Sequence, residues 1–255
     1  MTIREWREQL GIPLRAGAEL FKAAHRGGVV DERRPENSLE ALLAAVQAGY
    51  DLIETDLRST ADDYPVVFHD RDARRICGDQ REVAALTLEE FKRLRFLGAQ
   101  NGPVSFDEWV DALPAGIGVQ LELKVVGAAP PFYSRVADAL QRRSVWRRTL
   151  LFGQEAPDYL RERTLNWLSP QEALARARQG KITPGRCWFM ARVAELDETL
   201  ISTVSDAGVL AFVAINTHHY PPEEAVEAGL ADLRRVLPWP LRGIQLDSIY
   251  AAPLF

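Results

Sequence analysis

The stretch LFKAAHRGGVVDERRPENSLEALLAAVQAGYDLIETD, residues 20–56, contains two short apolar runs on either side of a helical pattern. The runs at 20–25 and 50–56 have the length and apolar character of parallel strands that are covered on both faces. Between them the spacing predicts a helix over 36–48, in which apolar residues recur at steps of three and four: Leu39, Leu42, Leu43 and Val46. Pro35 precedes this helix and Gly49 ends it.

The same alternation continues along the rest of the chain. Further strand candidates are 65–69, 118–124, 148–153, 186–191, 209–216 and 242–247. Further helical patterns lie near 88–95, 105–113, 132–143, 156–163, 170–179, 195–207 and 222–237. Eight strand candidates that alternate with helices predict an α/β fold of the TIM-type (β/α)8 barrel class.

This pattern predicts a single barrel domain over residues 1–255, with 1–19 as an N-terminal lead-in helix. The link between the second and third strand candidates is too short for a helix, so we expect an irregular connection there and a longer one at about 70–104. A doubly wound sheet is the alternative architecture. It normally carries a G-x-G-x-x-G turn after its first strand, and the sequence at 25–28 is HRGG instead.

Composition and net charge indicate which kinds of partner this chain is expected to bind. The 255 residues are 47% hydrophobic and 26% charged, which is typical of a globular chain with its own core. A net charge of −5 argues against nucleic acid as the main partner, because phosphate-backbone binding favours a basic face. The N-terminus has no apolar signal-peptide region, and no apolar run approaches the roughly 18 residues of a membrane span. We therefore expect a cytoplasmic protein without stable membrane insertion.

Three carboxylates stand near the ends of two strand candidates. Glu54 and Asp56 are two residues apart and therefore point to the same face of their strand, and Glu122 has the same relation to Lys124. The strand ends of a barrel meet at one mouth, where three carboxylates would repel each other without a cation. Oxygen ligands of this kind predict one divalent hard ion, Mg²⁺ or Ca²⁺, with Mn²⁺ also suitable.

Two of the four histidines lie at the ends of strand candidates as well. A histidine side chain can act as a general acid or as a general base near neutral pH, so His25 and His69 are the candidates for these roles, although the sequence does not show which has which. Arg26 and Lys124 are candidate phosphate contacts. Together with the carboxylates they predict metal-assisted cleavage of a small-molecule phosphodiester.

Further residues receive weaker interpretations. Glu36 suits the positive N-terminal end of the helix over 36–48, and Asn37 is a candidate for orienting His25 or the phosphate. Asn216 and His218 are candidates for the rim of the substrate pocket. Asp70 is interpreted as a turn residue.

The sequence resembles the glycerophosphodiester phosphodiesterase family. The resemblance lies in AHRGG at 24–28, PENS at 35–38, AVQAGYDLIETDLRST at 45–60, DDYPVVFHD at 62–70 and LELK at 121–124. It implies a TIM-type barrel in which Glu54, Asp56 and Glu122 bind a divalent metal and His25 and His69 are the acid and base. It also implies that Arg26 and Lys124 bind the phosphate, and that glycerophosphodiesters are cut to glycerol 3-phosphate and an alcohol.

The chain departs from the family pattern on the substrate side of the pocket. The seventh strand candidate keeps only Asn216 of a usual Trp-Thr pair followed by Asn, and the fifth reads LLFGQ at 150–154 in place of a Ser-Phe ending. Two alternatives therefore stay open: a lipid-directed phospholipase D of the sphingomyelinase type, and a catalytically silent barrel that binds metal and phosphate.

Overall fold

The computed structural model describes residues 1–14, 19–28, 30–31, 33–152 and 155–254. Parts of the expected lead-in over 1–19 and of the segment 148–154 lie outside these described residues. The strands are β1 Phe21–Ala24, β2 Leu52–Ser59, β3 Pro65–Val67, β4 Gly118–Leu123, β5 Thr149–Phe152, β6 Leu165–Trp167, β7 Cys187–Arg192, β8 Leu210–Ile215 and β9 Gly243–Leu246.

The α-helices are α1 Ile3–Leu10, α2 Leu39–Ala48, α3 Arg74–Cys77, α4 Leu88–Phe91, α5 Phe106–Ala112, α6 Pro130–Arg142, α7 Asp158–Arg161, α8 Pro170–Arg178, α9 Glu198–Asp206 and α10 Ala225–Val236. Short 3₁₀ helices cover Val83–Ala85, Trp146–Arg148, Val193–Glu195, Thr217–His219, Ser248–Tyr250 and Ala252–Leu254. Within the described part of the chain, no helix has both the length and the apolar character of a membrane span.

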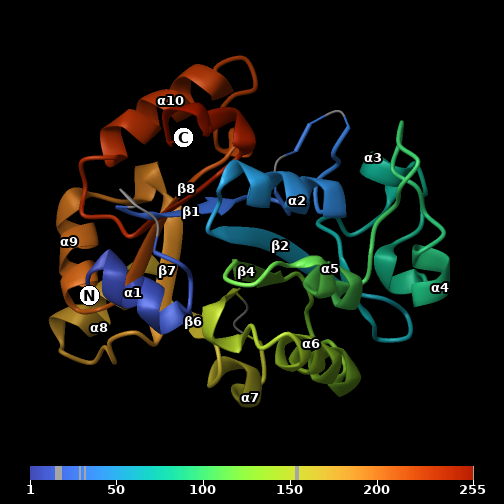
Figure 1. Ribbon diagram of the computed structural model, residues 1–255, viewed down its shortest axis with the longest axis horizontal. Coiled ribbons are helices and arrows are strands. Elements are labelled where there is room, and N and C mark those ends of the chain that lie inside the picture. The colour runs from blue at the N-terminus through green and yellow to red at the C-terminus, as the bar shows by residue number, and fades with distance from the viewer. Residues whose placement is uncertain (15–18, 29, 32, 153–154, 255) are drawn as a thin grey trace.

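Eight parallel strands close into a barrel. The strand order is β1-β9-β8-β7-β6-β5-β4-β2, and an additional pairing of β1 with β2 completes the circle. Helices such as α2, α6, α8, α9 and α10 lie around the outside of the strands (Figure 1). The predicted (β/α)8 barrel is confirmed.

One predicted barrel strand is wrong. The segment at 65–69 forms β3, which pairs antiparallel with β2 and takes no part in the closed ring. The four-residue span between Thr60 and Pro65 allows only a hairpin, because a parallel crossover needs a dozen or more residues. The eighth barrel strand is instead β6, a three-residue strand that the sequence analysis did not propose.

The hairpin brings the chain back to the barrel mouth. β2 continues past the ring as far as Ser59, and β3 runs back along it, so that the amide of Phe68 donates to the carbonyl of Asp56 at 3.0 Å. The next residue, His69, therefore returns to the level of the carboxylates. The long connection that follows contains α3 and α4, which form a separate projection at one side of the barrel (Figure 1).

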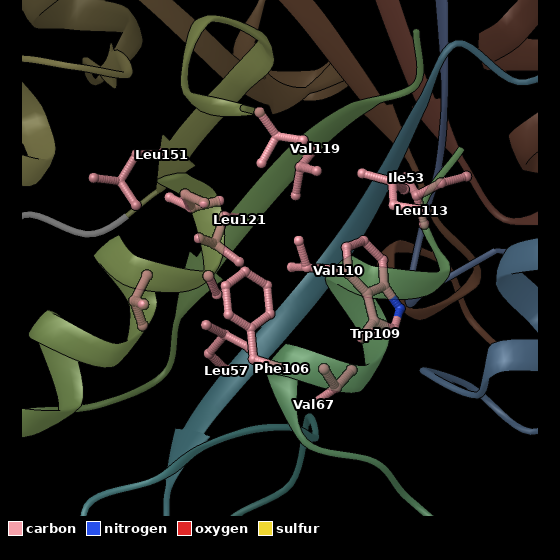
Figure 2. Close-up of a cluster of buried hydrophobic side chains, with 14 of the residues drawn as sticks. Ile53, Leu57, Val67, Phe106, Trp109, Val110, Leu113, Val119, Leu121 and Leu151 are labelled. Carbon is pink, nitrogen blue, oxygen red and sulfur yellow. The ribbon is translucent and has the colours of Figure 1, made fainter. Parts of the chain in front are cut away.

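The alternation of side chains along β2 separates core from site. Ile53 and Leu57 point outward into a buried cluster with Phe106 and Trp109 of α5 (Figure 2). Glu54 and Asp56 line the cavity at the mouth. The outer cluster fixes the strand in register, and this register determines which residues face inward.

Candidate active site

The three predicted carboxylates meet at the mouth of the barrel. In the pairing of β2 with β4, Asp56 lies directly opposite Glu122, and Glu54 lies one inward-facing position below Asp56. Carboxylate oxygens of Glu54, Asp56 and Glu122 all lie within 4.8 Å of one another. Glu54 is 5% exposed and Asp56 is 1% exposed, so two of the three charges are withdrawn from water.

The three carboxylates repel one another, and a bound cation would relieve this repulsion. Burial, together with the charges of Asp56 and Glu122, raises the pKa of Glu54 well above its usual range. Lys124 relieves part of the repulsion, since its Nζ lies 2.8 Å from Glu122 and 3.5 Å from Asp56. Three convergent carboxylates with one ammonium group suit a divalent ion with oxygen ligands, and the donor set therefore fits Mg²⁺, Ca²⁺ or Mn²⁺.

His25 is held by a carboxylate from the last strand. Because Ala24 pairs with Leu246 in the register of β1 and β9, the residues that follow each strand, His25 and Asp247, are also adjacent. His25 Nδ1 lies 2.6 Å from Asp247 Oδ1. The other oxygen of Asp247 accepts from the main-chain N–H and the hydroxyl of Thr217. This arrangement leaves His25 Nε2 as the ring nitrogen available to the cavity.

His69 has a carboxylate partner of its own. Its Nδ1 lies 2.7 Å from Asp70 Oδ1, and its Nε2 lies 3.3 Å from a guanidinium nitrogen of Arg26. Arg58 donates to the carbonyl oxygen of His69 and also to that of Lys124, at distances of 2.7 to 2.9 Å. One arginine thus fixes the backbone of two candidate site residues.

Arg26 occupies a strained turn at the end of β1. Its φ of 51° is left-handed, and its main-chain N–H donates to Glu54 Oε2 at 2.7 Å. The two glycines that follow allow this turn to lie close to the segment 35–38. A Cβ on Gly27 would lie 2.5 Å from the Cα of Asn37, and one on Gly28 would lie 2.0 Å from the carbonyl oxygen of Ala41.

The segment 35–38 plays a different part from the one predicted. α2 begins at Leu39, because the Ser38 side chain caps the helix by accepting from Ala41 N–H. Glu36 therefore lies in a turn before the helix, and its carboxylate pairs with Arg26 and Arg75. Its predicted role at the helix N-terminus is wrong.

Asn37 contacts a carboxylate ligand candidate and not His25. Its Nδ2 donates to Asp56 Oδ2 at 3.1 Å, and its Oδ1 accepts from the hydroxyl of Thr55 at 3.0 Å. The predicted orientation of His25 by Asn37 is therefore wrong, because the turn carries the amide over β2 and not over β1. Asp247 occupies the place beside His25 instead.

The candidate rim residues lie in the same cavity. This cavity has a volume of about 210 Å³, and its lining includes the two histidines, the three carboxylates, Arg26, Lys124, Asn216 and His218. The His218 ring lies 5.6 Å from the His25 ring. Burial, with the charges of His25 and Arg26, lowers the pKa of His218 to about 4, so this imidazole is neutral at pH 7. A second cavity of about 270 Å³ adjoins at His25, Arg26 and His218.

The amide of Asn216 belongs to a buried polar chain inside the barrel. Asn216 donates to Gln245, and Gln245 donates to Gln120. All three residues are at most 3% exposed. The Oδ1 atom of Asn216 is buried without a hydrogen-bond partner among the described residues, which leaves one acceptor at the cavity wall.

Sequence reasoning missed the residues that hold the site residues in place. Asp247, Asp70 and Arg58 contact candidate site residues directly, and Arg75 contacts Asp70 and Glu36 behind them. None of the four was assigned a site role. Asp70 was interpreted as a turn residue, but its carboxylate pairs with His69. The position of Asp247 directly after a barrel strand is the one signal that pointed to it.

The sequence of this chain matches a known protein family. The family model described as "Glycerophosphoryl diester phosphodiesterase family" matches residues 25–213. A Mycobacterium tuberculosis protein named "Probable glycerophosphodiester phosphodiesterase 2" is 30% identical over 138 residues, which are 54% of this chain and 49% of that protein. The bovine "Glycerophosphodiester phosphodiesterase 1" is 39% identical over 71 residues, 28% of this chain and 21% of the relative. The chain thus spans about half, or less, of these curated relatives.

The fold has solved counterparts. The crystal structure of a glycerophosphodiester phosphodiesterase from Agrobacterium tumefaciens superposes with a TM-score of 0.68 at 22% identity, covering 91% of this chain and 98% of that one. At this identity the likeness supports the barrel alone. The family model covers most of the chain, including both histidines and all three carboxylates. The chain therefore belongs to the glycerophosphoryl diester phosphodiesterase family.

Proposed function

We propose that this chain hydrolyses a small-molecule phosphodiester with the help of a divalent cation, and that the substrate is a glycerophosphodiester cut to glycerol 3-phosphate and an alcohol. The observation that carries the proposal is the cavity in which Glu54, Asp56 and Glu122 converge while His25 and His69 also line the wall. Membership of a phosphodiesterase family supports hydrolysis over the phospholipase D and silent-barrel alternatives.

The carboxylates of Glu54, Asp56 and Glu122 would hold the cation, as Mg²⁺, Ca²⁺ or Mn²⁺. When bound, the cation supplies a positive charge that stabilises the phosphate oxygens as negative charge grows in the transition state. Asn37 keeps one oxygen of Asp56 occupied by a hydrogen bond, so the carboxylate is fixed in orientation.

Arg26 and Lys124 would bind the non-bridging oxygens of the phosphate. Both line the cavity, and both carry charge that the carboxylates partly neutralise. Burial alone would lower the pKa of Lys124, but the negative charges of Asp56 and Glu122 outweigh burial and raise this pKa. The amine therefore stays protonated. Arg26 presents a planar fork suited to two oxygens.

The two imidazoles would carry out the proton transfers. One accepts the proton of the attacking hydroxyl, and the other donates a proton to the leaving alkoxide as the P–O bond breaks. The nucleophile is a water molecule or the neighbouring glycerol hydroxyl; the second route forms a cyclic phosphate, which water then opens. Asp247 and Asp70 hold the Nδ1 sides of the rings, so that each imidazole has its Nε2 atom toward the site.

A substrate panel followed by phosphorus NMR tests this proposal. Glycerophosphocholine, glycerophosphoethanolamine and a lysophospholipid are incubated with the protein and Mg²⁺, Ca²⁺ or Mn²⁺, with EDTA as the control. We expect glycerol 3-phosphate from the first two substrates and no product with EDTA. Absence of turnover with every ion, or cleavage of the lysophospholipid alone, would contradict the proposal.

A further inference from the structure

Five side chains form a closed ring of hydrogen bonds next to the carboxylate cluster. Listed in order around the ring, they are His69, Asp70, Arg75, Glu36 and Arg26. Arg75 Nε donates to Asp70 at 2.6 Å, and Arg75 Nη1 donates to Glu36 at 3.0 Å. Arg26 closes the ring, because one of its nitrogens donates to Glu36 at 3.0 Å and another lies 3.3 Å from His69 Nε2.

The ring specifies the tautomer of His69. A guanidinium group can only donate hydrogen bonds, so the contact from Arg26 requires a lone pair on His69 Nε2. A carboxylate can only accept, so the contact with Asp70 requires the proton on Nδ1. Both neighbours therefore favour the same neutral form of the ring.

Arg75 links the two halves of the ring, yet it stands outside the site. It lies on α3, in the projection that follows β3, and it lines neither of the two cavities at the mouth. Its side chain is 48% exposed, whereas the side chain of Glu36 is 9% exposed. Its nitrogens reach a carboxylate on each side, and these carboxylates contact His69 and Arg26.

We propose that Arg75 is a positioning residue for the hydrolysis proposed above, and that it acts by holding Asp70 against His69 and Glu36 against Arg26. The inference rests on the proposed function. It assigns to α3 a direct role in arranging the groups that receive the phosphate and move a proton.

Charge balance explains why an arginine is needed at this point. The ring contains two guanidinium groups, two carboxylates and a neutral imidazole. Burial alone would raise the pKa of Asp70, but hydrogen bonds from Arg75 and His69 lower it to about 2. Without Arg75, Asp70 would lose its guanidinium partner and Glu36 would keep Arg26 alone, so neither carboxylate would be held in its place in the ring.

Arg75 also contacts a second group of side chains that could hold a metal ion, besides the three carboxylates. Ligand atoms of Glu36, His69 and Asp70 lie within 4.8 Å of one another, a spacing that also suits a metal ion. Arg75 already supplies positive charge to both of these carboxylates. We therefore place the cation at Glu54, Asp56 and Glu122 and assign Arg75 to this second group.

Substitution of the exposed arginine tests the inference. The variants are Arg75→Gln, Arg75→Lys and Arg75→Ala, and Arg74→Gln is the matched control. Arg74 is exposed on the same helix, and its side chain has no hydrogen bond or ion pair among the described residues. The measurements are kcat/KM for glycerophosphocholine, the thermal midpoint, and the nitrogen-15 NMR signals of His69, which identify its tautomer.

We expect Arg75→Gln to lower kcat/KM by roughly 10- to 100-fold, as loss of a supporting hydrogen-bond partner typically does, with an unchanged thermal midpoint. His69 should lose its uniform Nδ1–H form in this variant. Arg75→Lys should recover part of the activity, and added guanidinium ion should partly restore Arg75→Ala. Arg74→Gln should stay within about twofold of the unaltered protein.

Two results would overturn the inference. One is an Arg75→Gln protein with unaltered kcat/KM and an unaltered His69 tautomer. The other is a loss of activity that follows a lowered thermal midpoint and that guanidinium does not restore, because the role would then be structural. If the unaltered protein cleaves no substrate, the proposed function fails, and the His69 tautomer still decides whether Arg75 maintains the ring.

Discussion

At the scale of single residues, each of the two candidate imidazoles is paired with an aspartate, and the two aspartates have different hydrogen-bond donors. Asp247 beside His25 accepts from the neutral donors of Thr217, whereas Asp70 beside His69 also accepts from the charged Arg75. The two histidines therefore experience different electrostatic surroundings even though each has an aspartate at Nδ1. This difference is a physical basis on which one could donate and the other accept a proton.

Replacement of His69 tests its part in proton transfer. His69→Ala removes the imidazole that we propose as general acid or base, and it does so without opening the core, because the side chain is 26% exposed at the mouth. We expect turnover to fall by roughly 100-fold or more. Steady-state kinetics on glycerophosphocholine measures the effect, and a change smaller than threefold would remove His69 from the chemistry.

Glu54 gives a prediction about pH. Its pKa is higher in the folded than in the unfolded protein, because of burial and the charges of Asp56 and Glu122. The folded state therefore binds the proton more tightly, and the stability of the cation-free protein falls as the pH rises above the ordinary value of 4.5. Glu54→Gln should reduce this loss, because the amide does not titrate.

Urea unfolding in EDTA at pH 5 and pH 8 measures the Glu54 effect. Stability should fall between the two pH values in the unaltered protein and fall less in Glu54→Gln. Added Mg²⁺ should stabilise the unaltered protein but not Glu54→Gln. Glu195→Gln is the control, since Glu195 is an exposed carboxylate lining the same cavity. Equal pH dependence in all three proteins would mean that Glu54 is not the source of the stability loss.

At the scale of elements, short turns determine whether the motifs come together. HRGG follows β1 and PENS precedes α2, and their contact depends on the two glycines. Gly28 has a φ of 144° and lies against the backbone of α2, so no side chain fits there without displacing the helix.

Gly28→Ala tests this contact. We expect the free energy of unfolding to fall by at least about 2 kcal/mol, since backbone strain and overpacking act together. Gly98→Ala is the control: its φ is also positive, at 76°, but a Cβ there meets nothing within 4 Å. Denaturant unfolding compares them, and equal losses in the two variants would show that close packing at Gly28 is unimportant.

The same scale shows what sequence patterns could and could not predict. The apolar run before His69 is indistinguishable from a barrel strand by periodicity alone, and only its short link to β2 indicates a hairpin. β6 was missed because it is three residues long and lies between polar segments. The clustered motifs predicted the groups at the mouth, but partners such as Arg75 and Asp247 depend on distant chain segments that meet only in the fold.

At the scale of the whole molecule, closure of the barrel unites residues that are far apart in sequence. The pairing of β1 with both β2 and β9 brings the amide of Arg26 to Glu54 on one side and the His25 ring to Asp247 on the other. The hairpin of β2 and β3 brings His69 back to the same end of the barrel. A site of this kind needs the complete ring, because its groups come from the ends of β1, β2, β4 and β9.

Anomalous diffraction from a crystal soaked in Mn²⁺ locates the cation without any assay of activity, and it therefore tests whether the three carboxylates at the barrel mouth bind a metal ion. We predict one manganese peak among Glu54, Asp56 and Glu122, at roughly 2.2 Å from their oxygens. A peak among Glu36, His69 and Asp70 instead, or no peak at the mouth of the barrel, would contradict a metal site at the three carboxylates.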